Sequence, residues 1–318
     1  MEHHKKIKIL NITGWGRSGS TIVGSILGEI DGFFFGGEIR TIWTLTLLKN
    51  RLCGCGVPSK ECAIWKSVIE EAYGGLEKVN PHEMIKLMKA GTRTSHLPLM
   101  LLSFWRNSLK RNLRPYLENL EKLYHAIQHV TNCKVIIDSS KSSGYSSLLG
   151  MITDFDLYIV HLVRDPRAVT YSWQRKKVIP DKNELLHFNT YSVLGSSLRW
   201  SIRNLASEAF WKKHPERYLI MKYEDFVEKP KEGVQKILDF IGEKPVGACH
   251  GIPFITDHSV SLSPNHALWG NPSRFKTGTV ELKKDEEWKE KMKITDKFIS
   301  TVLTWPLLLK YEYCGKKS

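Results

Sequence analysis

The sequence has few acidic residues and no long apolar run. Asp and Glu together number 33 against 47 Lys and Arg, which gives a formal net charge of +14 at pH 7 and a pI near 9.4. No stretch approaches the ~18 to 20 apolar residues that a membrane-spanning helix needs. The start, Met1 to Ile7, is also too weakly apolar for a signal peptide. We therefore expect a cytoplasmic protein whose positive charge attracts anionic partners.

Nucleic acid is the first partner that such a charge suggests, but the sequence lacks the usual signatures. It has no helix-turn-helix, zinc-finger or aromatic RNA-binding motif, and no long basic tail. Internal repeats and low-complexity tracts are missing too. We expect no nucleic acid partner, and we expect part of the positive charge to line a cleft for a small polyanion.

Cysteine is also scarce, with 6 residues in 318, and this number fits reduced thiols. Cys53, Cys55 and Cys62 are spaced like part of a metal site or a disulfide donor, but no fourth ligand follows at a recognised spacing. A polar loop with incidental thiols is the favoured interpretation. We expect no metal among the site residues.

The hydrophobic content of 42% in 318 residues is enough for a full core, and the length favours one α/β domain spanning residues 1–318. Apolar, β-branched stretches predict buried strands near 7–13, 134–138, 157–163 and 217–223. Helical patterns between them predict a P-loop-like parallel sheet flanked by helices, with ligands at the carboxyl ends of the strands. Residues 60–130 are mostly helical by pattern and form an insertion.

A glycine-rich loop joins the first expected strand to a helix. Residues 14–21 read Gly-Trp-Gly-Arg-Ser-Gly-Ser-Thr, and Ile22, Val23 and Ile26 then recur at helical spacing. Free backbone N–H groups and the positive end of the helix dipole attract an anion at such a junction. The segment therefore predicts a phosphate site, with a plain Gly/Ser turn as the alternative.

This loop lacks the lysine of nucleotide triphosphatases. The Walker pattern requires Gly-Lys followed by Ser or Thr, whereas this chain has Gly19-Ser20-Thr21 and carries Arg17 earlier in the loop. No Walker-type aspartate is evident either. The planar, bidentate Arg17 favours a donor that presents a single 5′-phosphate over a metal-assisted reaction of a triphosphate.

A second junction between strand and helix lies at Leu157 to Trp173 and contains Val-Arg-Asp-Pro-Arg. The apolar strand ends at Val163, Asp165 suits a helix N-cap, and Pro166 suits the first helical position. Together the two junctions resemble those of the sulfotransferases that use 3′-phosphoadenosine 5′-phosphosulfate (PAPS). The resemblance implies that the 5′-phosphosulfate is held by Gly16, Arg17, Ser18, Gly19, Ser20 and Thr21, and the 3′-phosphate by Arg164 and Ser172.

Four shorter segments extend this resemblance over the chain from about residue 7 to about residue 313. Within the family, they resemble the bacterial, tyrosylprotein and carbohydrate sulfotransferases. The resemblance implies a catalytic base at Glu38, a lysine aimed at the transferring group at Lys141, and a tyrosine near the nucleotide at Tyr223. It also implies cofactor contacts at Ser273 and Arg274 in a late loop. The chain departs from the cytosolic pattern of a loop lysine and a catalytic histidine, so the division of labour among Arg17, Lys141 and Glu38 stays open.

The resemblance implies transfer of a sulfuryl group from PAPS to an acceptor hydroxyl on a carbohydrate, a lipid or another small molecule. The remaining product is 3′,5′-bisphosphoadenosine. A P-loop nucleotide kinase or hydrolase is the alternative enzyme, and a nucleotide-binding module without catalysis is the third hypothesis. A glutamate merely paired with Arg40 is the structural alternative for Glu38, and His161 is expected to be a packed core histidine.

Substrate choice is expected to lie in the insertion. No acidic residue occurs between Glu83 and Glu118, while Lys and Arg gather around the apolar run from Leu97 to Trp105. A buried helix with a solvated basic face is the favoured interpretation. Peripheral contact with an anionic membrane, and with it a lipid-linked acceptor, is the alternative.

Overall fold

The computed structural model describes residues 6–93, 96–176, 178–181, 184–187, 189–244 and 252–314. The expectation about a signal peptide falls mainly on the first five residues, which lie outside these ranges. Among the described residues, no helix has both the length and the apolar character required to cross a membrane.

The centre of the fold is a parallel sheet of five strands in the order β2-β3-β1-β4-β7. Its strands are β1 (Ile7–Gly14), β2 (Phe33–Gly37), β3 (Val135–Asp138), β4 (Phe155–Val163) and β7 (Tyr218–Lys222). The four predicted strands and the parallel sheet are confirmed. The edge strand β2 was not predicted, because it is short and its last two residues are Gly36 and Gly37, which are typical of a turn. These glycines instead end the strand, where Gly37 adopts φ 72° next to an irregularity in the register.

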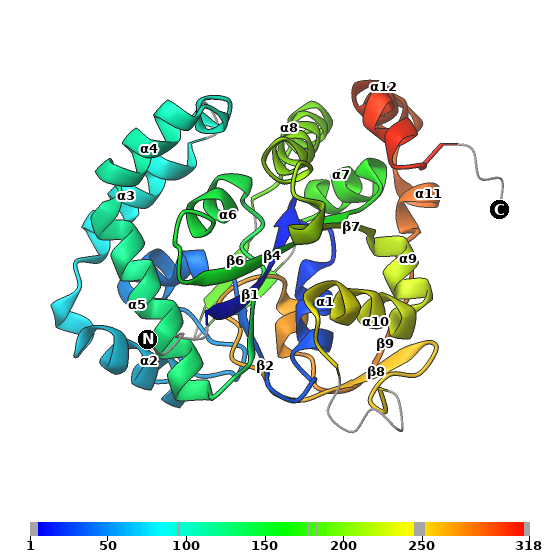
Figure 1. Cartoon of the computed structure of the whole chain (residues 1–318). Coiled ribbons are helices and arrows are strands. Elements are labelled where there is room, and N and C mark those ends of the chain that lie inside the picture. Colours follow the sequence, from blue (N-terminus) through cyan, green and yellow to red (C-terminus); the bar gives the residue numbers. More distant parts are fainter. Residues whose placement is uncertain are drawn as a thin grey trace.

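Helices cover both faces of the sheet (Figure 1). On one face, Ile7 and Ile9 pack with residues of α2 (Ala63–Tyr73), α3 (Pro81–Thr92), α5 (Arg114–Thr131) and α6 (Ser143–Leu149). On the other, Leu10 and Ile12 pack with α1 (Ser20–Leu27), α9 (Tyr223–Glu228) and α10 (Pro230–Ile241). Side chains alternate between the two faces of a strand, so a strand buried on both sides carries apolar residues on both, as β1 does with Ile7 and Ile9 on one face and Leu10 and Ile12 on the other.

The remaining elements lie around this core. They are the π-helix η2 (Ile42–Leu48), α4 (Ser103–Asn112), α7 (Pro166–Gln174), α8 (Val193–Trp211), α11 (Glu287–Lys291), α12 (Ile294–Lys310), the hairpins β5 (Val178–Asp181)–β6 (Glu184–His187) and β8 (Ser259–Leu262)–β9 (Gly278–Glu281), and the short turns η1 (Ile39–Thr41), η3 (Leu76–Lys78), η5 (Leu99–Leu101), η6 (Pro215–Arg217) and η8 (Pro272–Phe275). The insertion is helical, as predicted, since α2 to α5 occupy most of it.

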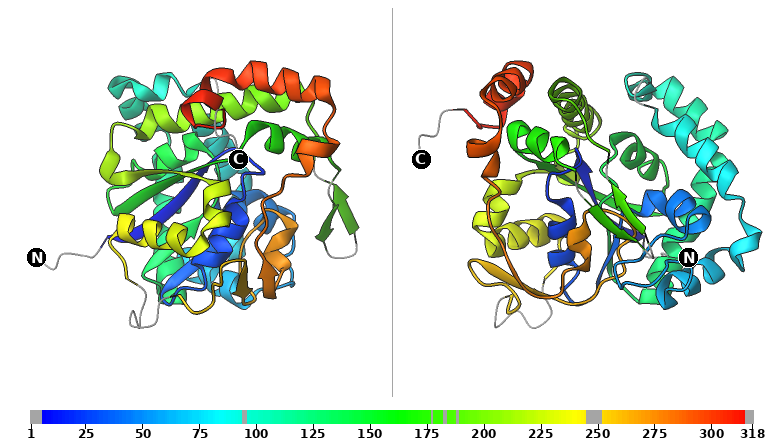
Figure 2. Two further views of the ribbon diagram at one scale, coloured as in Figure 1. Left: turned by 90° about the vertical axis from the view of Figure 1, so that its right-hand side faces the viewer. Right: turned by 180° about the vertical axis from the view of Figure 1, so that it is seen from behind.

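The apolar run of the insertion is not the buried helix that we expected. Leu97 and Met100 are buried, but Phe104 is 76% exposed and α4 buries none of its residues. The pattern misled because an apolar stretch looks the same in a sequence whether its partner is the core or something outside the chain. Figures 1 and 2 place α4 at the same end of the molecule as α8 and α12, which also expose large apolar side chains.

Candidate active site

A cavity of about 550 Å³ lies where the strands of the sheet end. The order of the strands explains its place, because the chain adds β2 and β3 on one side of β1 and then β4 and β7 on the other. Ligands of open α/β sheets bind in the crevice at the carboxyl ends of the strands, where the order reverses in this way. The predicted residues that line the cavity are Gly16, Arg17, Gly19, Ser20, Thr21, Glu38, Lys141, Arg164, Ser172, Tyr223 and Ser273.

The first wall is the loop between β1 and α1. Gly19 has φ 86° and packs so closely on Tyr223 that an added Cβ would lie 2.2 Å from its ring. Gly16 is equally crowded by Trp173, whose ring would come within 2.6 Å of a Cβ. Helix α1 follows with no acidic residue in its first turn, so the positive end of its dipole is uncompensated by side chains there. The loop therefore has the form of an anion site.

Arg17 is the cation of this loop. Its guanidinium lies over the ring of Trp173, 4.8 Å from the centroid. Burial lowers the pKa of Arg17 to about 10, so the side chain is still charged at neutral pH. Burial disfavours this charge and the nearby Glu38 carboxylate favours it, so Arg17 places a charged guanidinium in the loop, and such a group binds anions well.

Arg164 lies beside this loop because β1 and β4 are paired in register. Gly14 pairs with Leu162, so both strands release their loops at the same level of the sheet. Arg164 Nη1 donates to the carbonyl of Arg17 at 2.9 Å, and its guanidinium lies 4.9 Å from the centroid of the Tyr223 ring. Arg164 also forms an ion pair with Asp285, with 3.1 Å between Arg164 Nη2 and Asp285 Oδ2. The two predicted phosphate subsites are therefore neighbours.

The helix after β4 begins as predicted. The side chain of Asp165 caps α7 by accepting from the backbone N–H of Arg167 at 2.8 Å, and Pro166 is the first helical residue. Ser172, further along the same helix, lines the cavity. Its side chain is 1% exposed, and its Oγ has no hydrogen-bond partner among the described residues. A buried hydroxyl of this kind needs a partner, and the cavity is where a ligand can supply one.

Glu38 and Lys141 form an ion pair in the lining of the cavity. Gly37 pairs with Asp138 at the ends of β2 and β3, so the residues that follow these strands meet. Lys141 Nζ lies 2.6 Å from Glu38 Oε1, and each side chain is 14% exposed. The structure thus pairs Glu38 with Lys141, whereas the structural alternative paired it with Arg40. A carboxylate, an ammonium and the Arg17 loop together face one cavity.

The sequence also matches a known protein family. A family model described as "Sulfotransferase family" matches residues 10–245. The chain belongs to the sulfotransferase family. No curated protein matches the sequence significantly.

The chain is also similar to solved structures of low sequence identity. The sulfotransferase domain from the Synechococcus PCC 7002 olefin synthase matches at a TM-score of 0.50 and 18% identity, over 96% of each chain. The sulfotransferase domain from the curacin biosynthetic pathway matches at a TM-score of 0.44 and 15% identity, over 93% of this chain and 96% of that one. Sulfotransferase STF9 from Mycobacterium avium matches at 0.41 and 13%, over 76% of this chain and 64% of that one. The first of these similarities supports the sulfotransferase fold.

Two predicted site residues of this sulfotransferase lie away from the cavity lining. Ser18 is buried at 2% exposure and its Oγ has no partner among the described residues. Arg274 is 1% exposed and donates to the carbonyls of Gly270 and Leu52, at 3.3 and 3.4 Å. Arg274 therefore helps to hold the late loop, and its neighbour Ser273 lies in the cavity lining.

Several cationic and aromatic residues that line the sulfotransferase cavity carry no functional signal in the sequence. Seven Lys and Arg residues line it against three carboxylates, Glu38, Glu281 and Asp285. Those that we did not assign to the site are Arg40, Arg203, Lys276 and Lys283, together with Trp173 and Tyr191. Arg203 and Tyr191 lie on or just before α8, and only the packing of that helix reveals which of its residues face the cavity.

The other titratable candidates are structural. His161 is fully buried; its Nδ1 accepts from Tyr218 Oη at 2.6 Å, and its Nε2 donates to Asn204 Oδ1 at 2.7 Å. Burial lowers the pKa of His161 to about 4, so it is neutral, and the prediction of a core histidine is confirmed. Asp138 is likewise fully buried and accepts from Tyr124 Oη at 2.6 Å.

Backbone conformation also marks the site. Among the described residues, six that are not glycine have positive φ, and three of these, Arg17 (70°), Lys141 (51°) and Trp269 (49°), line the cavity. Residues other than glycine adopt this conformation at a cost, and such positions gather at functional sites.

Proposed function

We propose that this sulfotransferase moves a sulfuryl group from PAPS to an acceptor hydroxyl, leaving 3′,5′-bisphosphoadenosine. The proposal rests on one observation above all: two phosphate-type subsites, the Arg17 loop and the Arg164–Ser172 pair, line the same cavity and are bridged by the hydrogen bond from Arg164 to the carbonyl of Arg17. A donor with phosphate at both its 3′ and 5′ positions matches two such subsites.

The residues present fit this donor. Gly16 and Gly19 to Thr21 offer backbone N–H groups to the 5′ end, and Ser172 Oγ is a buried hydroxyl without a partner among the described residues. Cations outnumber carboxylates in the lining, which attracts a strongly anionic ligand and speeds its capture. Tyr223, which packs on Gly19, borders the nucleotide. Ser273 and Arg274 of the late loop complete the proposed contact set.

Glu38 is proposed as the general base, and Lys141 and Arg17 as the groups that stabilise charge during transfer. Glu38 takes the proton of the acceptor hydroxyl as the acceptor oxygen bonds to sulfur and the bond from sulfur to the 5′-phosphate oxygen breaks. Arg17 and Lys141 donate hydrogen bonds to the oxygens on which negative charge grows. Glu38 then releases its proton to solvent, and the sulfate ester and 3′,5′-bisphosphoadenosine leave.

A kinase or nucleotide hydrolase is less well supported. The loop has no lysine for a β- or γ-phosphate. Of the three carboxylates in the lining, Asp285 is paired with Arg164 and Glu38 with Lys141, so they are poorly disposed to hold magnesium. We propose that sulfuryl transfer itself needs no metal.

Ligand-dependent stability tests the donor. A ligand that binds only the folded state raises the melting temperature by mass action. We expect 3′,5′-bisphosphoadenosine to raise it more than AMP, ADP or ATP with magnesium at equal concentration. A larger rise with ATP, together with ATP turnover, would favour the kinase or hydrolase. Binding without transfer of ³⁵S from labelled PAPS to any hydroxyl compound in a carbohydrate and lipid panel would favour a binding module.

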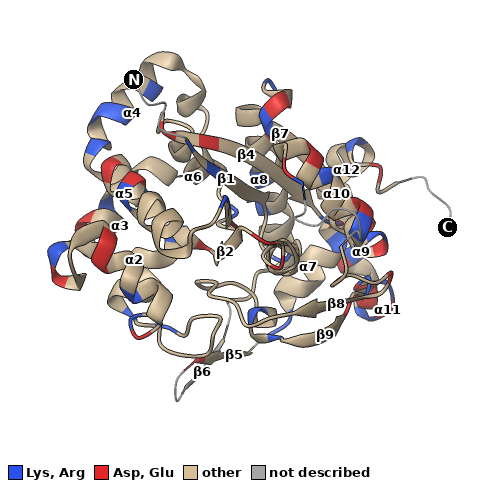
Figure 3. Ribbon diagram, turned by 60° about the horizontal axis from the view of Figure 1, so that its bottom comes forward, with Lys and Arg blue, Asp and Glu red and all other residues tan. Residues whose placement is uncertain are grey.

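We also propose that residues 1–318 form a single sulfotransferase domain that works in the cytoplasm, at the surface of an anionic membrane. Exposed apolar side chains on α4, α8 and α12 support membrane contact, among them Phe104, Phe298 and Ile294 at 76%, 70% and 82% exposure. Helix α4 carries Arg106, Lys110 and Arg111 and no acidic residue (Figure 3), so its charge suits anionic headgroups. Among the acceptor classes, this surface favours a lipid.

Vesicle co-sedimentation tests this contact. We expect binding to vesicles of phosphatidylglycerol, weaker binding to phosphatidylcholine, and a loss of binding in the double variant Phe104→Ser, Trp105→Ser. Val57→Ser is the matched control, because Val57 is 41% exposed but belongs to none of these helices. Equal binding by the double variant and the control would remove α4 from the proposal.

A further inference from the structure

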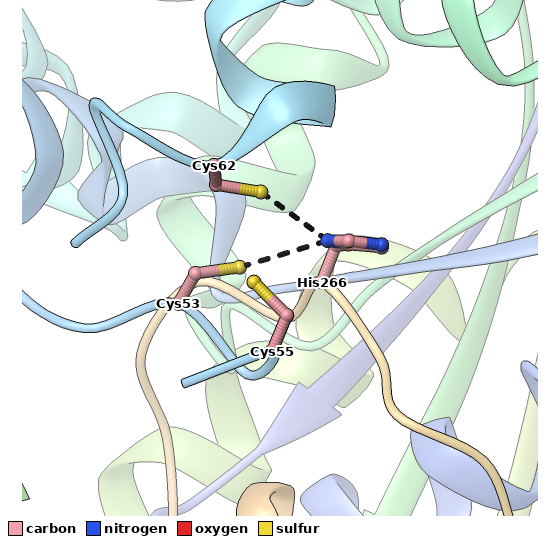
Figure 4. A group of neighbouring side chains, drawn as sticks. All are labelled: Cys53, Cys55, Cys62 and His266. Atoms are coloured by element: carbon pink, nitrogen blue, oxygen red, sulfur yellow. Dashed lines mark hydrogen bonds between the residues drawn. The ribbon is translucent and has the colours of Figure 1, made fainter. Parts of the chain in front are cut away.

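Three cysteines and a histidine converge outside the cavity (Figure 4). Cys53, Cys55 and Cys62 precede α2, whereas His266 follows β8, roughly two hundred residues later in the chain. One ligand atom from each residue lies within 4.8 Å of all the others. Cys62 Sγ is 3.2 Å from His266 Nδ1, and Cys53 Sγ is 4.0 Å from it. The fourth ligand that the local sequence lacks is thus supplied by a distant segment.

These separations suit one tetrahedral ion. Zinc binds sulfur at about 2.3 Å and imidazole nitrogen at about 2.0–2.1 Å, which puts the ligand atoms of a tetrahedral site about 3.5–3.8 Å apart. The observed distances of 3.2 and 4.0 Å lie on either side of that range. Three thiolates and an imidazole are soft ligands that select zinc over magnesium or calcium. We propose that Cys53, Cys55, Cys62 and His266 form a structural zinc site.

The backbone around the cysteines is built for close approach. Cys53 N–H donates to the carbonyl of Val57 at 2.8 Å, and Gly54 N–H donates to that of Ala267 at 3.0 Å. A Cβ on Gly54 would lie 2.2 Å from the side-chain oxygen of Asn265. It would also lie 2.9 Å from the backbone oxygen of Asn265, so glycine suits the close approach of the Cys-Gly-Cys turn to the segment that carries His266.

The backbone of His266 is held in place by a hydrogen bond from α2. Trp65 Nε1, at the start of α2, donates to the carbonyl of His266 at 2.7 Å. Cys53 and Cys62 are buried, at 0% and 1% exposure, and all three thiols of the group are free. A disulfide between any two of them would not explain why the third thiol and the imidazole of His266 lie at the same place. A zinc ion uses all four groups.

The site ties the active-site wall together. Leu268, two residues after His266, accepts from the backbone N–H of Glu38 at 2.7 Å, and its own N–H donates to the carbonyl of Gly36 at 2.9 Å. Gly270 and Ser273, a few residues further on, line the cavity. Zinc would thus fasten the late loop to the end of β2 and hold the backbone of Glu38 in place. It would act as a brace, separate from the chemistry of transfer.

Metal content tests the proposal without any measurement of activity. We expect about one zinc per chain by inductively coupled plasma mass spectrometry, and less than about 0.1 in Cys62→Ser and His266→Ala. His266→Cys restores a four-ligand set and is expected to retain the metal, which separates loss of a ligand from loss of fold. Cys314→Ser and His214→Ala are matched controls outside the group and are expected to keep the full zinc content.

Cobalt and thiol counting supply independent readings. Chain refolded with cobalt in place of zinc is expected to show the intense visible bands of tetrahedral thiolate coordination, and His266→Ala is expected to lose them. Wild-type protein denatured with chelator and without reductant is expected to show all 6 thiols. A chain without zinc or cobalt coordination, or one in which two of Cys53, Cys55 and Cys62 are oxidised to a disulfide, would overturn the site.

Discussion

Replacing Arg164 by alanine is expected to weaken binding of 3′,5′-bisphosphoadenosine while leaving AMP almost unaffected. The side chain is 6% exposed and lines the cavity, where we propose that it binds the 3′-phosphate. A hydrogen bond to a charged group contributes about 1.5–3 kcal/mol. At 1.4 kcal/mol for each factor of ten, losing it should raise Kd by about 10- to 150-fold.

The structure puts the expected loss near the lower end of this range. Arg164 already has a carboxylate partner, since its Nη2 lies 3.1 Å from Asp285 Oδ2, and a phosphate must compete with this contact. Part of the interaction is therefore exchanged rather than newly formed, and we expect about a 10-fold loss. By the same reasoning, Asp285→Asn should bind 3′,5′-bisphosphoadenosine more tightly than the wild type.

Isothermal titration calorimetry with both ligands is the assay. Arg164→Lys keeps the positive charge but loses the planar, bidentate guanidinium, and its Kd for 3′,5′-bisphosphoadenosine is expected to lie between those of the alanine variant and the wild type. Arg167→Ala is the matched control, because Arg167 pairs with Asp165 and lies outside the cavity lining. An equal loss for AMP and 3′,5′-bisphosphoadenosine would refute the reasoning. It would mean that Arg164 acts mainly by holding the carbonyl of Arg17, and that the 3′-phosphate lies elsewhere.

Three further predictions concern catalysis and acid stability. Glu38→Gln should bind 3′,5′-bisphosphoadenosine normally and lose ~100-fold or more in kcat, the usual scale for a general base; a rate near wild type in a sulfotransfer assay would contradict this. Arg17→Ala should lower kcat more than it raises the acceptor KM, because its charge acts in the transition state; a change in acceptor KM alone would count against it. Because the pKa of His161 falls from 6.5 to about 4 on folding, the unfolded chain takes up a proton that the folded chain does not. Stability should fall as pH drops from 6.5 to 4, by at most about 3 kcal/mol, and a melting series in which His161→Gln shows an equally steep fall would disprove this origin.

The parts of the fold that the sequence predicted are those specified locally. The strand and the capped helix on either side of Arg164 follow from an apolar run, Asp165 and Pro166, which act within a few residues of one another. The loop containing Arg17 is equally local. Because parallel strands end at one edge of the sheet, predicting these junctions also predicted that their residues meet.

The parts that were not predicted depend on contacts between distant segments. Which residues of α8 face the cavity, such as Arg203, is set by how that helix packs on the sheet. His266 lies beside the cysteines because its segment bonds to Gly54, to Trp65 and to the end of β2, all distant in the sequence. The contacts of Arg274 with the carbonyls of Gly270 and Leu52 likewise depend on how distant segments pack.

The positive φ angles of Arg17, Lys141 and Trp269 imply a trade-off between folding stability and activity when this enzyme is engineered. Glycine at each position would relieve a backbone cost of roughly 1 kcal/mol or more, so selection for heat resistance alone is expected to enrich glycine there. At Arg17 and Lys141 such a gain would remove the charges that we assign to transfer. Stabilising libraries for this chain should therefore keep Arg17 and Lys141 fixed and vary the exposed faces of helices remote from the cavity.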